Sequence, residues 1–351
     1  MNVPPFQPPP LFNADPRRSD RPVRTQGRKI VAVTGAAGYL GSRLVAYLTQ
    51  QPWVERIIAF DVLPMPADGR VISYQINVRD SQALRPILAE HGVTHFVHGA
   101  FMISRPPGWT ADQMLAANVY TANDAFKAAF AAGIEHVTFI SSVAVYGYLP
   151  GTNGPLLETS ALHASMVYAR HKAITESNLF GLSSRQYPHA KLAVIRMAAV
   201  AGQMGSSRSP LASLNKAPVF VVVNGGKART QAIHEDDAAS LIGTIIRQDA
   251  AGVFHGAPDD SRTWREIGDL SGRRPFSMPR RLLRLISRLN PLLPVLNGLT
   301  PEIVDLLAYS LTVDNRATRQ RLNWAPRYST AETYAQLFNS SPAAIASLDL
   351  R

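Results

Sequence analysis

Two side chains able to exchange a proton lie four residues apart in the stretch YARHK, residues 168–172. If this stretch is helical, Tyr168 and Lys172 share one face, and the lysine ammonium favours the phenolate of a tyrosine whose free pKa is about 10. Such a pair could take a proton from a hydroxyl group and return it. Tyrosine and lysine at this spacing are more often a surface pair, so the surrounding motifs must decide.

Three glycines stand between an apolar run and a helical pattern in VAVTGAAGYLGSRLV, residues 31–45. A strand ending at Thr34, a tight turn at Gly35 and a helix starting near Gly38 would aim backbone N–H groups at an anion. Side chains at these positions would block the approach of a diphosphate. The next predicted strand ends at Asp61, where a carboxylate can bind ribose hydroxyls. The pattern predicts a dinucleotide site.

The whole turn is expected to contact the cofactor, through Gly35, Ala37, Gly38, Tyr39, Leu40 and Gly41. Asp61 would repel a 2′-phosphate, and the residues VLPMP that follow it offer no arginine to bind one. NAD is therefore favoured over NADP. Arg56 or Arg79 remains an alternative source of such a contact.

The glycine spacing GxxGxxG is joined by ISSVAVYG at 140–147 and by YARHK at 168–172. Further along the chain are QAIHEDDAA at 231–239 and VDNRATRQRLNWAP at 313–326. With these motifs the chain resembles the extended short-chain dehydrogenase/reductase superfamily, and within it the NAD-dependent epimerase/dehydratase family, over about residues 29–335. The resemblance implies NAD as the cofactor and is much less specific for the substrate.

The resemblance implies catalytic roles for three side chains. Ser142 would hydrogen-bond the oxygen of the reacting carbon, and Tyr168 would remove or return the proton of that oxygen as a hydride moves to or from NAD. Lys172 would also hold the nicotinamide ribose. Ser141 is expected to be structural.

The resemblance also implies further contacts with the cofactor. These positions are Asn77 and Val78 at the adenine, Gly99, Ala100 and Phe101 near the pyrophosphate and ribose, and Asn118 at the start of the helix behind the site. The family more often has an aspartate in place of Asn77.

Several positions depart from the pattern of the family. Its dehydratases carry an acid pair directly after the serine, where this chain has Val143 and Ala144, so dehydration is disfavoured. Sugar-nucleotide epimerases usually have an asparagine at the place of Ala199 and an arginine at that of Thr230, although Arg229 is adjacent. These departures put a diphosphate-sugar substrate in doubt.

Short β-rich runs alternate with segments of helical spacing from residue 29 onward. The runs KIVAVT, RIIAF, THFVHG, HVTFIS and LAVIRM are apolar on both faces, which is typical of a parallel sheet covered on both sides. We predict an α/β fold, a doubly wound parallel sheet (Rossmann fold) with a smaller, interleaved C-terminal substrate-binding part. The predicted division is an NAD-binding domain at 29–200 continuing through 219–257, a substrate-binding part mainly at 201–340, and a tail at 341–351.

Residues 1–28 carry seven prolines and five arginines without apolar periodicity, so we expect a disordered tail and not a signal peptide. The chain has no cysteine, no metal-binding spacing of histidines and no apolar run of the roughly 18 residues that a membrane span needs. We expect a cytoplasmic protein without a metal ion. The net charge of +11 comes without an aromatic and basic binding platform, so no nucleic acid is predicted.

The segment MPRRLLRLISRLNPLLPVLNGL, residues 278–299, is rich in arginine and leucine. On a helix the two types separate into faces, as in a helix that lies at a lipid surface. These faces are Arg281, Arg284 and Arg288, and Leu282, Leu285, Ile286 and Leu289. Such a helix more often covers an apolar pocket or a subunit contact, so peripheral membrane contact is kept as an alternative that is not favoured. Either arrangement favours a substrate with a hydrophobic part.

Two hypotheses for the activity remain open. An epimerase, for instance of a sugar nucleotide, would oxidise its substrate, rotate the bound ketone and reduce it again with the same cofactor. A dehydrogenase or reductase of a hydrophobic alcohol, steroid-like or lipid-linked, would exchange NAD at every turnover. A non-catalytic nucleotide-binding assembly protein is less favoured, because Tyr168 and Lys172 are both present. By analogy we expect a homodimer built on the helices after Asn118 and around Tyr168.

Overall fold

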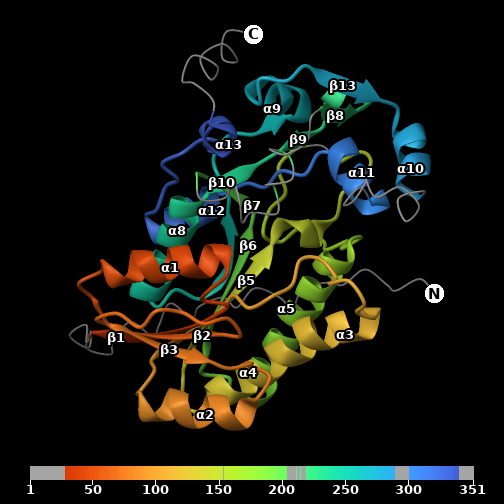
Figure 1. The fold of residues 1–351 in the computed structure, drawn as a ribbon. Coiled ribbons are helices and arrows are strands. Elements are labelled where there is room, and N and C mark those ends of the chain that lie inside the picture. Colours follow the sequence, from red (N-terminus) through yellow and green to blue (C-terminus); the bar gives the residue numbers. More distant parts are fainter. Residues whose placement is uncertain are drawn as a thin grey trace. The chain divides into compact units, whose positions relative to one another are not determined.

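The computed structural model describes residues 28–152, 154–203, 211, 214, 219–288 and 300–339. The chain forms two compact units that interleave along the sequence (Figure 1). The first unit comprises Met1–Ser141, His171–Ile195 and Ala239–Phe254, and the second comprises Ser142–Arg170, Arg196–Ala238 and His255–Arg351. The chain therefore enters each unit three times.

A seven-stranded sheet has the strand order β11-β6-β5-β4-β1-β2-β3. Its strands are β1 (Lys29–Thr34), β2 (Val54–Asp61), β3 (Val71–Gln75), β4 (His95–His98), β5 (His136–Ser142), β6 (Lys191–Met197) and β11 (Gly252–Gly256). The pairs β1–β2, β2–β3, β1–β4 and β4–β5 are all parallel. The chain starts in the middle of the sheet and winds toward both edges, which confirms the predicted doubly wound α/β fold.

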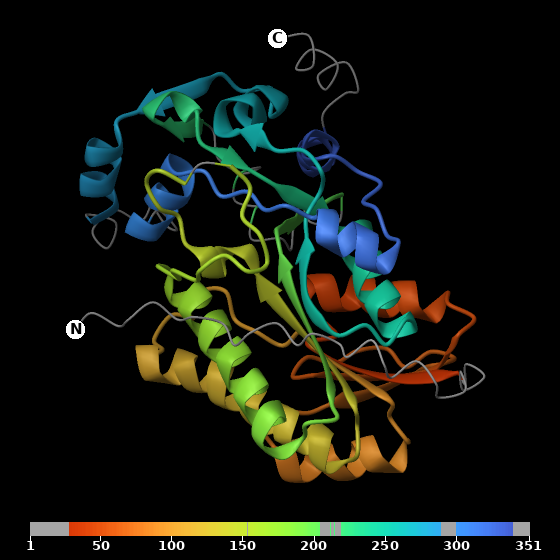
Figure 2. The same ribbon diagram turned by 180° about the vertical axis from the view of Figure 1, so that it is seen from behind.

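Helices cover both faces of the sheet in the first unit. α1 (Tyr39–Thr49) and α8 (Glu235–Arg247) lie on one face, and α2 (Ser81–Glu90), α4 (Thr121–Ala131) and α5 (Val167–Gln186) lie on the other (Figures 1 and 2). α1 illustrates the pattern, because its buried residues repeat at helical spacing and are Gly41, Leu44, Val45 and Leu48. Strands covered in this way must be apolar on both sides, which explains the continuous apolar runs of the sequence.

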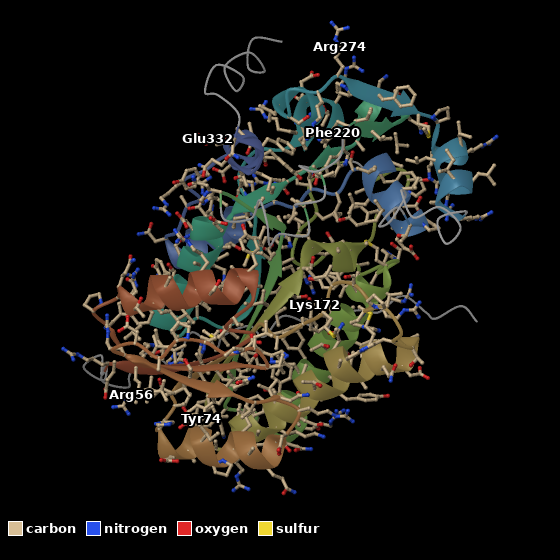
Figure 3. The ribbon with its side chains drawn as sticks, in the orientation of Figure 1. Arg56, Tyr74, Lys172, Phe220, Arg274 and Glu332 are labelled. Atoms are coloured by element: carbon tan, nitrogen blue, oxygen red, sulfur yellow. The ribbon has the colours of Figure 1, made fainter. Side chains whose placement is uncertain are left out.

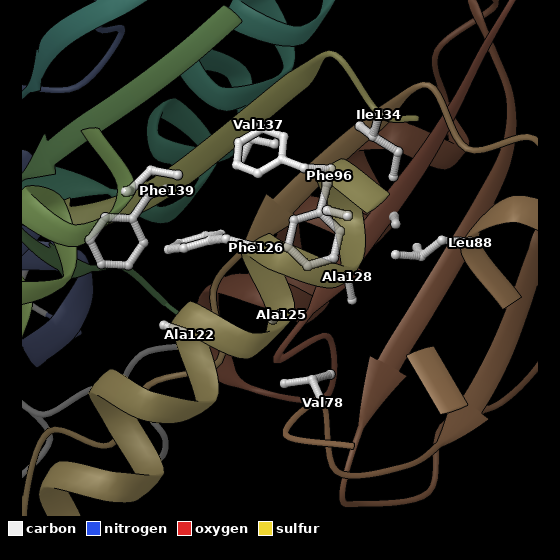
Figure 4. Close-up of a cluster of buried hydrophobic side chains, with 14 of the residues drawn as sticks. Val78, Leu88, Phe96, Ala122, Ala125, Phe126, Ala128, Ile134, Val137 and Phe139 are labelled. Carbon is white, nitrogen blue, oxygen red and sulfur yellow. The ribbon is translucent and has the colours of Figure 1, made fainter. Parts of the chain in front are cut away.

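The core of the first unit is built on aromatic side chains (Figure 4). Phe126 of α4 meets Phe139 of β5 edge to face, with ring centroids 5.9 Å apart and planes at 84°. Phe96 of β4 is fully buried beside them. Truncating one such ring to alanine typically costs about 3–5 kcal/mol, so this cluster is a main source of stability for the unit.

The second unit combines short sheets with helices. Its strands are β7 (Ala199–Ala201), β8 (Phe220–Val223), β9 (Arg229–Thr230), β10 (Ala232–His234), β12 (Arg262–Thr263) and β13 (Pro275–Met278), paired as β10-β7, β12-β9 and β13-β8. Its helices include α9 (Trp264–Leu270), α10 (Arg280–Arg288), α11 (Pro301–Ala308), α12 (Arg316–Leu322) and α13 (Thr330–Phe338). Phe220, Trp264 and Tyr334 are buried in its core. None of the helices in the described parts of the chain has the length and apolar character needed to cross a bilayer.

The late HEDD motif forms a structural junction in the second unit. Asp237 is fully buried, and one carboxylate oxygen accepts the backbone N–H groups of Arg327 at 2.8 Å and Tyr328 at 3.0 Å. The other oxygen accepts from the Arg327 guanidinium at 3.1 Å. His234 bonds Gln336 of α13 at 2.9 Å. These contacts fix the chain that leads into α13.

Replacing Asp237 by alanine would leave the part-buried backbone N–H groups of Arg327 and Tyr328 without this acceptor. We expect Asp237→Ala to lower the free energy of unfolding by about 3 kcal/mol. The matched control is Asp236→Ala, whose carboxylate lies 3.8 Å from the exposed Arg327 guanidinium and should contribute under about 1 kcal/mol. Urea unfolding measures both variants. Equal losses would show that Asp237 does not hold this segment.

Candidate active site

The turn between β1 and α1 depends on the absence of side chains. Gly35 has a φ of +71°, and a Cβ there would lie 2.7 Å from the backbone nitrogen of Ala100. A Cβ on Gly41 would collide with the carbonyl oxygen of Gly35. Gly38 is the N-cap of α1, and no side chain caps this helix. The first N–H groups of α1 are therefore left to be satisfied by something other than a capping side chain.

Asp61 ends β2 beside this turn. One carboxylate oxygen accepts the N–H of Ala37 at 2.9 Å, and the other accepts the N–H of Leu63 at 3.0 Å. Each oxygen keeps further acceptor capacity for a ribose hydroxyl. Arg56 lies five residues earlier on the same strand, about 16 Å away in an extended chain, so it is too distant to bind a 2′-phosphate beside Asp61. Arg79 is exposed and stays an alternative.

These residues fit a dinucleotide. The expected cradle has three parts. They are the space that a Cβ would fill at the turn, the N-terminus of α1 without a capping side chain, and the Asp61 carboxylate at the end of the next strand. The Val78 side chain is 5% exposed and belongs to the core, so the predicted adenine contact would be made by its backbone. Asn77 is exposed and accepts the N–H of Arg79 at 3.0 Å.

Asn118 lies within a helix and not at its start, so that part of the prediction is wrong. The helix begins with α3 (Ala111–Leu115), where Thr110 and Gln113 form a capping box, and continues through the π-helical turn η1 (Ala116–Tyr120) into α4. The fully buried Asn118 amide accepts the N–H of Met102 at 2.8 Å and donates to its carbonyl at 2.9 Å. Asn118 thereby fixes the loop that carries Gly99, Ala100 and Phe101.

In the second unit, Ser142 and Tyr168 are hydrogen-bonded to each other through their hydroxyl groups. Ser142 ends β5, and its oxygen also accepts the N–H of Ala144 at 3.2 Å, capping the short 3-10 helix η2 (Val143–Tyr146). Burial raises the pKa of Tyr168 to about 12, and the Ser142 hydrogen bond opposes this rise because it stabilises the phenolate. The serine and tyrosine predicted as a pair are thus brought together.

Lys172 follows Tyr168 on α5 and lies in the interior of the first unit, 3% exposed (Figure 3). Its ammonium donates to the carbonyl oxygen of Ile140 at 2.5 Å and lies 3.7 Å from the ring centroid of Phe101. Burial holds the pKa of Lys172 well below its usual value, and the Glu176 carboxylate opposes this effect. A lysine with a lowered pKa and fixed donors is typical of a functional site.

Glu176 was missed by the sequence analysis. It is 1% exposed on α5 and accepts a hydrogen bond from Ser141 at 2.5 Å. Its spacing of four residues from Lys172 was the available signal, since Tyr168, Lys172 and Glu176 follow one another at helical intervals. The Ser141 hydroxyl holds this buried carboxylate, and its structural role stays a prediction.

The positions that depart from the family pattern lack a cation. Arg229 extends to Ser261, with its Nε 2.9 Å from the serine hydroxyl and a terminal nitrogen 2.5 Å from the carbonyl oxygen. Thr230 lies beside the buried Tyr334 hydroxyl. Burial raises the pKa of Tyr334, and the Thr230 side chain opposes this rise. Thr230 supplies no cation, and the Arg229 guanidinium is engaged by Ser261. In the described residues, no group of three or more acidic, histidine or cysteine side chains could hold a metal ion.

The model of the NAD dependent epimerase/dehydratase family matches residues 31–255, which is more than half of the chain. The chain belongs to this family. The match begins in β1 and ends in β11, so it includes the glycine turn, Ser142, Tyr168 and Lys172. Family membership confirms the predicted resemblance, the prediction of an NAD-dependent enzyme and the prediction of NAD as its cofactor.

Relatives resemble the chain over most of its length. An uncharacterized protein of Mycobacterium tuberculosis is 25% identical over 321 residues, covering 88% of this chain and 83% of the relative. The UDP-glucose 4-epimerase of Halalkalibacterium halodurans is 25% identical over 325 residues, covering 87% of this chain and 93% of the epimerase. The structure of MoeE5 in complex with UDP-glucuronic acid and NAD has a TM-score of 0.70 at 22% identity, covering 88% and 97% of the two chains, which shows the shared fold.

A methyl group at Gly41 should abolish the cradle. Because the new Cβ would collide with the Gly35 carbonyl, we expect Gly41→Ala to weaken NAD binding more than about tenfold, by displacing the N-terminus of α1. Ala46→Ser, at an exposed position of the same helix, should bind NAD normally. Calorimetric titration with NAD measures both variants. Unchanged affinity of Gly41→Ala would contradict this account of the turn.

Proposed function

We propose that the chain transfers a hydride between NAD and a carbinol or carbonyl carbon, with Tyr168 as the general acid and base. The hydrogen bond between Tyr168 and Ser142 is the observation that carries the proposal. It joins a proton donor and acceptor to a second hydroxyl that can bind the same substrate oxygen. NAD, when bound, supplies the hydride acceptor or donor.

The proton chemistry follows from the state of Tyr168. With a pKa raised to about 12, the phenol is protonated at neutral pH and is ready to donate its proton to a carbonyl oxygen during reduction. In the oxidative direction the phenol must first lose this proton, and the Ser142 hydrogen bond makes that loss easier. Lys172 follows four residues later on α5, and burial holds its pKa well below the usual value.

We further propose that the reaction is an epimerisation, of which a sugar nucleotide is one candidate substrate. The support is the similarity to the UDP-glucose 4-epimerase of Halalkalibacterium halodurans over 93% of that enzyme.

A second candidate is a dehydrogenase or reductase of a hydrophobic, uncharged alcohol. The observation that favours it is the engagement of Arg229 with Ser261, next to a threonine at the usual arginine position. A diphosphate would require cations or aligned backbone donors at its binding site. In the epimerase candidate these donors must come from another part of the chain.

The dimer also remains a proposal. Tyr120 in η1 and Ile174 on α5 are 51% and 42% exposed, which is unusual for large apolar side chains in the middle of helices. Both lie on the helices expected to form the subunit contact. Light scattering of the purified chain measures the mass directly.

One experiment separates the two candidate functions. The purified protein is denatured, and the released nucleotide is identified and quantified by mass spectrometry. Near-stoichiometric NAD or NADH, together with conversion of UDP-glucose to its 4-epimer, supports the epimerase. A protein that is isolated empty, binds added NAD reversibly and forms NADH with a hydroxysteroid supports the dehydrogenase. Release of NADP would contradict the interpretation of Asp61.

Tyr168→Phe removes one oxygen and should leave the fold intact. We expect it to retain NAD and to lose turnover by about a thousandfold or more, because the proton donor is missing. Ser184→Ala, which removes an exposed hydroxyl from the same helix, is the control and should keep activity. NAD content and turnover are measured on each protein, and an active Tyr168→Phe enzyme would rule out the assignment of the acid and base.

Ser142→Ala tests the pKa of Tyr168. Because the Ser142 hydrogen bond lowers this pKa, its removal should raise the pKa further and move the alkaline rise of the oxidative rate to higher pH. The sign follows because oxidation needs the deprotonated phenol. The pH profile of kcat/KM with the substrate found above measures this, and a shift to lower pH would refute the proposed role.

A further inference from the structure

Helix α10 does not place its leucines where the sequence analysis expected them. Leu283 and Ser287 are each 3% exposed and form the inward side of the helix. Leu282 and Leu285 are 48% and 56% exposed. Within the described residues these two leucines therefore cover no pocket of the chain itself, which leaves a subunit contact or a membrane surface among the expected alternatives.

Polar contacts fix which side of α10 faces outward. Arg280 donates to Asp305 of α11 at 2.7 Å and, through its backbone N–H, to Asn224 at 3.1 Å. Arg284 lies 3.7 Å from the same Asp305. Two successive turns of α10 are thereby tied to α11, with Leu283 packed in the core of the second unit. The helix cannot turn its exposed leucines inward without breaking these contacts.

The outward side of α10 carries two leucines flanked by two arginines. Arg281, Leu282, Leu285 and Arg288 stand at positions i, i+1, i+4 and i+7, which form one stripe on a helix. Arg281 and Arg288 are exposed, and neither side chain forms an ion pair or hydrogen bond with the described residues. The stripe is therefore apolar along its middle and cationic at both ends.

The surroundings of the stripe are strongly basic. Residues 273–288 contain six arginines and no acidic residue, and of these arginines Arg280 and Arg284 are paired with Asp305 of α11. Arg274, just before β13, also points away from the ribbon (Figure 3). A single exposed leucine on a protein surface needs no explanation. Two neighbouring exposed leucines between two unpaired arginines favour a partner with an apolar interior and an anionic surface.

A second copy of the chain does not match this chemistry. In a two-fold contact the same patch lies on both sides, so Arg281 and Arg288 would face the arginines of the other copy. Like charges brought together in this way oppose association. An anionic bilayer supplies both parts, with phosphate groups for the arginines and acyl chains for the leucines.

We propose that α10 is a membrane-docking helix that lies in the interface of a bilayer containing anionic lipid. Leu282 and Leu285 enter the boundary of the acyl chains, while Arg281 and Arg288 bind lipid phosphates, their long side chains reaching outward to the headgroups. Arg274 adds to the attraction at longer range. The proposal does not depend on the reaction that the enzyme catalyses.

Vesicle co-sedimentation of the full chain tests the proposal. The probes are vesicles of phosphatidylcholine alone and of phosphatidylcholine mixed with phosphatidylglycerol. We expect binding to the mixed vesicles, weakened by salt, and little binding to the neutral ones. The double variant Leu282→Ser/Leu285→Ser and the double variant Arg281→Gln/Arg288→Gln should each reduce binding about tenfold or more. Urea unfolding verifies that both variants are folded.

Matched controls come from exposed residues elsewhere in the chain. Leu157→Ser and Arg247→Gln change the same residue types outside α10 and should bind vesicles as the original chain does. Three outcomes would overturn the proposal. They are equal binding to neutral vesicles, binding that survives the leucine substitutions, and a dimer in light scattering that those substitutions dissociate, which would assign the patch to a second copy.

Discussion

The close approach of backbone to backbone at the end of β1 is the constraint on which the first unit depends. Gly35 lies against the backbone of Ala100 after β4, while Ala37 donates to Asp61 at the end of β2. One turn thus joins the loops that follow three neighbouring strands. The strand order reverses between β1 and β4, and a doubly wound sheet leaves room for a ligand at this point. Close packing and cofactor binding therefore require the same glycines.

A second constraint is the burial of a lysine. An ammonium removed from water is costly unless it is hydrogen-bonded, and the pKa of Lys172 is lowered accordingly. The Ile140 carbonyl and the Phe101 ring offset part of this cost, and Glu176 supplies an opposing charge that Ser141 holds in place. Phe101 is itself fixed through the amide of Asn118, which clamps Met102. The site is therefore built on a chain of buried polar contacts.

Much of this arrangement could be predicted from local pattern. The five apolar runs become central strands because a sheet covered on both faces requires apolar residues at every position. The glycine turn and Asp61 were predictable because few residues can perform their tasks. The capping box at Thr110 was also readable, from threonine followed three residues later by glutamine, and overlooking it misplaced the start of the helix.

Other features depend on contacts that no local pattern contains. The π-helical turn at Asn118 exists where the amide reaches a loop sixteen residues earlier in the chain. The outward side of α10 was ambiguous, because its arginines and leucines are compatible with two rotations of the helix. Asp305, from a later helix, selects one of them by binding Arg280 and Arg284. In both cases a residue distant in the sequence determines the local structure.

The placement of the arginines also changes the meaning of the net charge. A formal charge of +11 suggests an anionic ligand when the sequence is taken as a whole. In the second unit, however, Arg229 is engaged by Ser261, and the buried Arg196 donates to the Tyr146 hydroxyl at 2.8 Å. Arg281 and Arg288 are the exposed cations of α10. The net charge therefore indicates which partners the surface of this enzyme attracts. It does not indicate the substrate, which depends on the residues around Tyr168.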